Sequence, residues 1–176
     1  RCNLEKVNGV YQGAVFRFTQ GIEAGVNRLV WGPDGSLYIG GVGSNGDWNH
    51  QNHRFGLQRL VPTTEQTFEI HSVRATSKGF DVTFTEAFKE LTSKNLEVDS
   101  FRYDSKGIYG GPKVDLNRFP VRATPGKDRK SVSIEVPEMK KGYVYHLRFV
   151  GLKSAKGANL WSAETWYTLN NVPGRP

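Results

Sequence analysis

The run VNRLVWGPDGSLYIGG at residues 26–41 constrains the fold more than any other part of the chain. Apolar β-branched and aromatic residues stand on both sides of the Gly-Pro-Asp-Gly segment 32–35. Proline sets the backbone angle φ at the first corner of a tight turn, and Gly35 tolerates a positive φ. The pattern therefore predicts a β-hairpin with strands at 26–31 and 36–41.

The rest of the chain also has the sequence pattern of β-strands. Short runs in which apolar and polar residues alternate recur about every ten residues, with turn residues between them, which predicts an all-β protein. Residues 86–97 are expected to contain a short helical turn, and residues 105–117 a long Gly-rich loop. The expected strands lie at 10–19, 26–31, 36–41, 55–61, 67–75, 80–85, 98–104, 118–124, 131–137, 143–150 and 161–169.

The segment Pro62-Thr63-Thr64 marks the expected boundary between two parts. Residues 1–61 hold about four strands, as one propeller blade does, whereas a whole propeller has about four to eight blades. Residues 62–176 hold about seven strands, which is typical of an Ig-like or fibronectin-type sandwich. A lone blade exposes long sheet edges, so we expect it to be covered by the sandwich, a second copy or a partner chain.

The chain is basic, with 24 Lys and Arg against 17 Asp and Glu and a net charge of +7. This excess fits either a solvated loop rim or attraction to a polyanion such as an anionic glycan. No recognition-helix or RNP-type motif supports nucleic-acid binding, and no apolar run approaches the roughly 18 residues of a membrane span. The basic residues include Lys127, Arg129, Lys130, Lys140, Lys141, Lys153 and Lys156.

Cys2 is the only cysteine, so no intrachain disulfide can form. Its thiol is either a spare group near a chain end or a partner for a cysteine in an upstream region. A single cysteine fits both a cytosolic and a periplasmic protein. The chain begins at Arg1 rather than Met, which we interpret as removal of a leader or an upstream region.

Four stretches resemble the C-terminal part of bacterial soluble propeller proteins related to glucose/sorbosone dehydrogenases. The resemblance implies a quinoprotein-like propeller followed by an Ig-like sandwich, in exported proteins of secreted or periplasmic location that often carry c-type cytochrome or carbohydrate-linked modules. The stretches are YQGAVFRFTQGIEAGVNRLVWGPDGSLYIGG at 11–41, FGLQRL at 55–60, FEIHSVRATSKGFDVTFTEAF at 68–88 and WYTLN at 166–170.

The resemblance carries no catalytic residue to this chain. Catalysis in that family depends on a cofactor held over a complete propeller by several blades, and most of those blades are absent here. PQQ or calcium is therefore expected only together with upstream blades, and no cofactor is expected in this chain. The chain also has no Cys-x-x-Cys-His run for covalent haem, no Gly-x-Ser-x-Gly elbow and no phosphate loop.

The first candidate site is the polar loop at residues 42–54. An aromatic face with amide donors suits a sugar ring, so we predict carbohydrate binding here; a solvated loop and a loop packed on a neighbouring domain are the alternatives. The two histidines are spaced i, i+3 as in some metal sites, but no carboxylate or cysteine pattern supports a metal. The candidate residues are Trp48, Asn49, His50, Asn52, His53 and Arg54.

The second candidate site is the Gly-rich loop that follows residue 103. Its tyrosines and lysines could bind a glycan or an acidic surface, because loops at the ends of sandwiches often carry function; a plain connection is the alternative. The candidate residues are Tyr103, Lys106, Tyr109 and Lys113.

A third aromatic group lies in the last expected strand. Trp161 and Trp166 are five residues apart and would point to opposite faces of a regular strand. We therefore expect one tryptophan in the core and the other at the surface or an interface. Tyr167 is the third aromatic residue of this group.

These observations leave three hypotheses. The first is a non-catalytic accessory module that binds a polysaccharide or oligosaccharide, with the positive charge favouring an anionic or sulfated one. The second is the C-terminal part of a sugar dehydrogenase, inactive without an upstream propeller. The third is a docking module for an electron-transfer partner, whose binding would weaken as salt increases.

Overall fold

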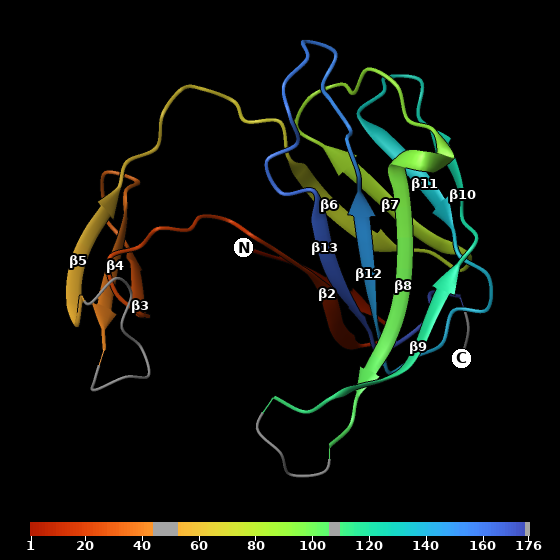
Figure 1. Ribbon diagram of the computed structural model, residues 1–176, viewed down its shortest axis with the longest axis horizontal. Helices are drawn as coiled ribbons and strands as arrows, with labels where there is room; N and C mark the ends of the chain where they lie inside the picture. Colours follow the sequence, from red (N-terminus) through yellow and green to blue (C-terminus); the bar gives the residue numbers. More distant parts are fainter. Residues whose placement is uncertain (44–52, 106–109, 175–176) are drawn as a thin grey trace. The chain divides into compact units, whose positions relative to one another are not determined.

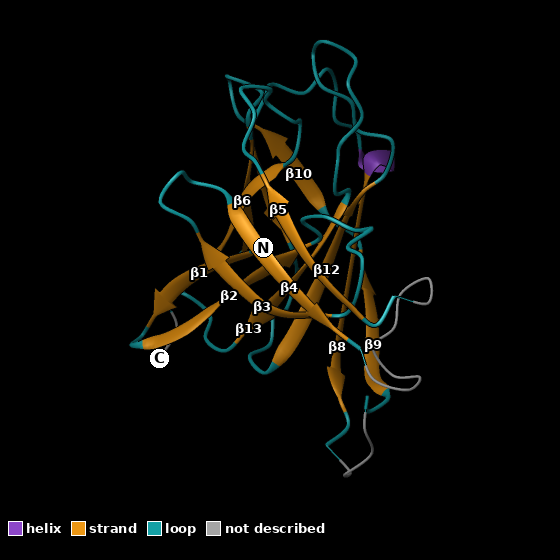
Figure 2. Ribbon diagram, turned by 90° about the vertical axis from the view of Figure 1, so that its left-hand side faces the viewer, coloured by secondary structure: helices purple, strands orange, loops and turns teal. Residues whose placement is uncertain are grey.

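The computed structural model describes residues 1–43, 53–105 and 110–174. The protein is all-β, as the sequence predicts, with three antiparallel sheets. A single short turn of 3₁₀ helix, η1 (Ser93–Asn95), lies within the predicted helical segment (Figure 2). None of the described residues belongs to a helix long and apolar enough to cross a membrane.

The chain divides into two compact units. The larger unit contains residues 1–18 and 67–176, and the smaller unit contains residues 19–66. The sequence-based division at residue 61 differs from this one mainly in the placing of residues 1–18. The physical reason is that the first strand pairs with the second, and the second pairs with the last strand of the larger unit.

The larger unit is a sandwich of two sheets (Figure 1). The six-stranded sheet has the order β1 (Cys2–Val7), β2 (Val10–Phe16), β13 (Glu164–Leu169), β12 (Tyr143–Phe149), β8 (Leu96–Tyr103) and β9 (Lys113–Phe119). The four-stranded sheet has the order β10 (Arg122–Pro125), β11 (Ser131–Glu135), β7 (Gly79–Phe84) and β6 (Ile70–Ala75).

The core lies between the two sheets and is built mainly from alternate residues of β2, β6, β7, β8, β11, β12 and β13. Phe80 on β7 packs against Tyr145 on β12 and Tyr167 on β13, with ring centroids 5.3 Å and 5.1 Å apart. All three side chains are buried. Burying rings of this size contributes about 1.5–3 kcal/mol each, so these inward positions hold the sandwich together and leave the alternate residues outside.

The smaller unit is a three-stranded sheet of β3 (Val26–Trp31), β4 (Leu37–Val42) and β5 (Phe55–Leu60). The predicted hairpin is confirmed, because β3 and β4 pair antiparallel. The pair next to the turn is Trp31 with Leu37, and the last pair is Val26 with Gly41. The turn uses its glycine as expected: Gly35 has φ +75° and its amide donates to the Gly32 carbonyl over 3.1 Å. The expected fourth strand of this sheet is absent from it, since β2 pairs with β13.

Two further expectations differ from the structure. The predicted strand 118–124 is divided at Pro120 between β9 and β10, which belong to different sheets. Proline has no amide hydrogen to donate to a continuing ladder, and the chain changes sheet there. The expected loop at 105–117 is also shorter, because β9 already begins at Lys113.

Candidate functional site: a groove beside Trp161

The first predicted cluster lies mostly outside the described residues. Trp48, Asn49, His50 and Asn52 lie there, so their prediction stays a prediction. His53 and Arg54 are described and exposed, immediately before β5. His53 Nδ1 lies 3.6 Å from the carboxylate of Glu23, within the same unit.

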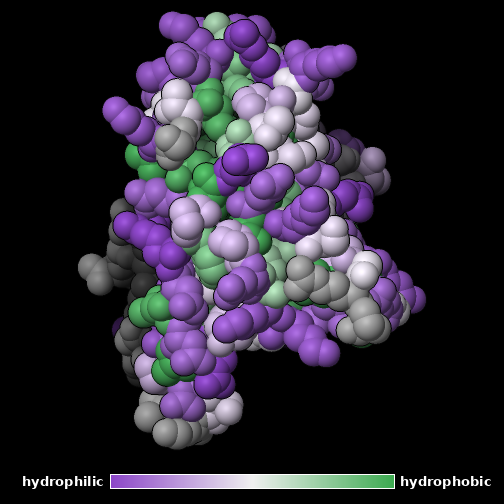
Figure 3. All heavy atoms as spheres, turned by 90° about the vertical axis from the view of Figure 1, so that its right-hand side faces the viewer, coloured by the Kyte–Doolittle hydropathy of each residue, from purple (hydrophilic) through white to green (hydrophobic). Residues whose placement is uncertain are grey.

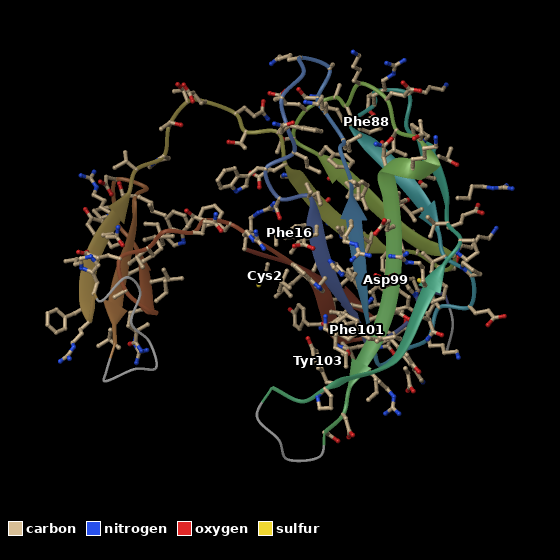
Figure 4. All side chains as sticks on the ribbon, viewed as in Figure 1. Cys2, Phe16, Phe88, Asp99, Phe101 and Tyr103 are labelled. Atoms are coloured by element: carbon tan, nitrogen blue, oxygen red, sulfur yellow. The ribbon has the colours of Figure 1, made fainter. Side chains whose placement is uncertain are left out.

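The second cluster is partly assembled at the paired ends of β8 and β9. Tyr103 and Lys113 are cross-strand partners. Lys113 Nζ lies 4.2 Å from the ring centroid of Phe101. The rings of Phe101 and Tyr103, whose centroids are 5.3 Å apart, lie on the same strand (Figure 4). Tyr103 is 55% exposed and could contact a ligand, whereas the lysine ammonium is already engaged. Lys106 and Tyr109 lie outside the described residues.

The third cluster does not follow the prediction of one buried tryptophan. β13 begins only at Glu164, so Trp161 lies in the preceding loop and is 54% exposed. Trp166 is half-buried on the outer face of the sheet, where it stacks on His146 with centroids 4.6 Å apart. The core position is taken by Tyr167 instead, because its register places it on the inner face.

Trp161 stands at a groove of about 380 Å³ in the larger unit. Three segments meet here, because β2 and β12 both end where their antiparallel neighbour β13 begins. This volume lies within the about 300–1,000 Å³ typical of small-molecule sites. The groove is lined by Arg17, Arg148, Phe149, Val150, Gly151, Trp161, Ser162, Ala163 and Glu164.

Two hydrogen bonds hold the Trp161 residue in place. Its indole Nε1 donates to the carbonyl of Phe18 over 3.0 Å, and its backbone amide donates to the carbonyl of Phe68 over 2.9 Å. The ring is thereby fixed by the segments that leave β2 and enter β6, although half of its surface remains open to solvent. A fixed, half-exposed indole loses little conformational freedom when it binds a ligand.

Charged groups form the polar part of the groove. Arg17 Nη2 lies 3.6 Å from Glu164 Oε1, and the other oxygen of Glu164 is 2.9 Å from Nε2 of His146. Arg148 Nη2 lies 2.7 Å from both Glu97 and Asp99 on the neighbouring strand β8. The groove therefore offers donors from guanidinium groups and acceptors from a carboxylate beside one aromatic face.

One donor of this network stays without a partner. Arg148 Nε is buried and has no hydrogen-bond partner among the described residues. Within the same part of the chain, no group of three or more His, Cys, Asp or Glu side chains could hold a metal ion.

The sequence hypothesis missed Arg17, Arg148 and Glu164. A signal was present, because Arg148 alternates with the inward-facing Leu147 and Phe149 and must therefore face outward;. No family model, curated protein or solved structure matches this chain. The site therefore rests on geometry alone.

Proposed function

We propose that the chain is a non-catalytic accessory module, in an exported carbohydrate-active or sugar-oxidising protein, that binds carbohydrate through the larger unit. The observation that carries the proposal is the half-exposed indole of Trp161, fixed at the edge of a groove that also contains Arg17, Arg148 and Glu164. This site replaces the predicted loops as the leading candidate.

The chemistry of the groove suits a sugar. A pyranose ring presents an apolar C–H face that can pack on an aromatic ring, while each hydroxyl both donates and accepts hydrogen bonds. An arginine only donates hydrogen bonds and a carboxylate only accepts them. An arginine and a carboxylate side by side can therefore donate to a sugar hydroxyl and accept from it. An apolar contact with a few placed polar groups is the usual composition of a ligand site.

The strand order supports an Ig-like assignment of the sandwich, which we also propose. An immunoglobulin constant-type domain has strands A, B, E and D in one sheet and C, F and G in the other. The sheet β6-β7-β11-β10 has the order expected of A-B-E-D, and β13-β12-β8 has that of G-F-C. The hairpin of β1 and β2 then extends the second sheet beyond its G strand.

Affinity electrophoresis of the full chain against a panel of soluble polysaccharides tests the function. We expect at least one polysaccharide to retard the wild type, and Trp161→Ala to abolish that retardation. Tyr103→Ala is the matched control, since Tyr103 is an equally exposed aromatic residue on the same unit but not in the groove. Retardation that persists in Trp161→Ala and is lost in Tyr103→Ala would move the site to the paired ends of β8 and β9.

A second candidate function is favoured by the smaller unit. Its sheet carries exposed apolar side chains on both faces, with Leu29 and Trp31 on one and Phe55 and Leu57 on the other. A sheet that is apolar on both faces is stabilised by a further layer on each, as a propeller blade would be. This supports a structural role in a larger sugar dehydrogenase, with PQQ or calcium bound only by further blades.

A dye-reduction assay tests the non-catalytic character that both candidates share. The chain is incubated with PQQ, calcium and either glucose or sorbosone. We expect no turnover above the protein-free control. Turnover by the purified chain would show that it contains a complete active site, and would contradict both candidates.

A further inference from the structure

We infer that the groove beside Trp161 selects a neutral sugar with adjacent hydroxyl groups, rather than an anionic or sulfated one. This inference rests on the proposed function, which it makes more specific. It departs from what the net charge of +7 suggests, because both arginines of the groove are already paired with carboxylates of the protein.

The pairing can be followed residue by residue. Two arginines line the groove, Arg17 and Arg148, and each lies within 4 Å of a carboxylate. Arg17 is paired with Glu164 in the lining, and Arg148 with Glu97 and Asp99 on β8. The described lining of the groove contains no lysine.

An anionic ligand would meet an obstacle in this arrangement. A sulfate or uronate that approaches Arg17 must also approach the carboxylate of Glu164, only 3.6 Å from that guanidinium. Arg148 is already neutralised by Glu97 and Asp99. Like charges at short range repel, so an added anion would have to displace a carboxylate that the protein already supplies.

A neutral sugar meets no such obstacle. One hydroxyl can accept a hydrogen bond from Arg17 and donate one to Glu164, since a hydroxyl does both. Two adjacent hydroxyls match the planar, two-pronged shape of a guanidinium or carboxylate group. The apolar face of the same ring is then available to Trp161, and Val150, which is 50% exposed, extends that apolar contact.

Several other basic side chains lie on loops away from the groove. Lys89, Lys127 and Arg129 line a separate depression of about 370 Å³ in the larger unit. Figure 3 shows that hydrophilic side chains cover most of one face of the molecule, including the end at the top of the view. Any attraction of polyanions is therefore expected from such a solvated rim and not from the groove.

The test compares neutral and anionic polymers, and includes a neutral and an anionic derivative of cellulose as well as dextran with and without sulfate. Hydroxyethyl cellulose, galactomannan and dextran are the neutral probes, and carboxymethyl cellulose, alginate and dextran sulfate are the anionic ones, each at about 20 mM and about 500 mM salt. We expect a neutral polymer to retard the chain at both salt concentrations, with a loss of at least about tenfold in affinity in Trp161→Ala.

Two controls keep the test independent of folding. Circular dichroism checks each variant, and quenching or enhancement of tryptophan fluorescence by the retarding polymer reports binding in the unmodified chain. Lys127→Gln combined with Lys130→Gln removes positive charge from the rim. It should leave the neutral interaction unchanged and weaken any retardation by dextran sulfate.

The outcomes separate the inference from the proposed function. Retardation by anionic polymers alone, through a site that Trp161→Ala removes, would overturn the inference and leave carbohydrate binding standing. Retardation by anionic polymers that salt abolishes and Trp161→Ala does not affect would overturn both and favour a polyanion-binding rim. Binding to none of the six polymers and no fluorescence change would overturn both as well.

Discussion

The indole nitrogen of Trp161 donates a hydrogen bond of 3.0 Å to the backbone carbonyl of Phe18, 143 residues away in the sequence. The bond connects the loop before β13 to the segment that follows β2. Because these strands pair in the same sheet, the bond continues their contact beyond the last ladder residue. It turns an exposed aromatic side chain into a fixed one.

Replacing Trp161 by phenylalanine separates the ring from its hydrogen bond. The variant keeps an aromatic face but loses the donor to Phe18, so we expect binding intermediate between those of the wild type and Trp161→Ala. The bond is exposed, and its loss should cost at most about 1 kcal/mol of folding stability. Isothermal titration with the retarding glycan and urea unfolding measure the two effects. Equal affinities of the phenylalanine and alanine variants would show that the ring alone does not suffice.

Replacing Trp48 by alanine discriminates between the groove and the polar loop predicted from sequence. The groove proposal assigns no role to Trp48 and therefore expects unchanged affinity for the glycan. The sequence hypothesis expects binding to be abolished. Affinity electrophoresis of this variant beside Trp161→Ala decides between them, and loss of retardation in Trp48→Ala alone would refute the groove.

The local strands could be predicted from the sequence, but several of their partners could not. Alternation in 80–85 predicts that Phe80, Val82 and Phe84 share one face, and all three are buried, because burial of every second side chain is a local property of a strand. Pairing is not local. Residues 10–19 carry the same alternation whether they join the sheet of 26–41 or that of β13, and the structure places them with β13.

The hydrogen bonds of Tyr167 stabilise the attachment of the N-terminal hairpin to the sandwich. Its buried hydroxyl accepts from Nε2 of Gln12 on β2 over 2.8 Å and donates to Glu5 on β1. Burial first, and then the bond to Glu5, raise the pKa of this phenol, so it remains protonated and able to donate.

Tyr167→Phe should therefore lower the free energy of unfolding by about 1–3 kcal/mol, because polar atoms of Gln12 and Glu5 lose a partner. Urea denaturation followed by circular dichroism measures the loss. Tyr103→Phe is the matched control, since its ring is exposed, and should change stability little. Equal stabilities of the two variants would contradict a stabilising role of the network.

The candidate site was less accessible to sequence reasoning than the fold. Aromatic residues can be recognised in a sequence, and Trp161 is one of those that the sequence analysis names. Its proposed role in ligand binding, however, depends on the neighbouring Arg17 and Arg148. Arg17 follows the end of β2 and Arg148 lies near the end of β12, and both meet Trp161 only because of the strand order β2-β13-β12. A site made at the meeting of three strand ends has no contiguous motif.

The Asp34 carboxylate of the β3–β4 turn provides a prediction about pH. The backbone amide of Ser36, then its hydroxyl and the guanidinium of Arg59, hold the pKa of this carboxyl below its usual value. A carboxyl whose pKa is lower in the folded state stabilises that state above its unfolded pKa, and the contribution is lost as pH falls through the folded pKa. Asp34→Asn should therefore destabilise the hairpin at neutral pH and have a shrinking effect in acid.

Two measurements check this behaviour. Carboxyl titration by NMR should place the Asp34 midpoint below the about 3.9 of an unperturbed aspartate. Amide exchange within the hairpin should be faster in Asp34→Asn than in the wild type near neutral pH, and the two should converge in acid. A midpoint at or above 3.9 would contradict the turn hydrogen bonds described here;.

The exposed apolar side chains of the smaller unit predict a tendency to associate. Phe55 and Leu57 are 74% and 77% exposed and lie on the same face of β5. Exposed apolar groups of this kind mark interaction surfaces when they are contiguous.

Phe55→Lys combined with Leu57→Lys should reduce binding of a hydrophobic dye and any self-association seen by light scattering. Glycan retardation should not change, because the proposed groove belongs to the larger unit and both residues to the smaller one. If the wild type is monomeric and binds no dye, this sheet is not an interaction surface in the isolated chain, and the proposal of a structural role in a larger propeller loses its support.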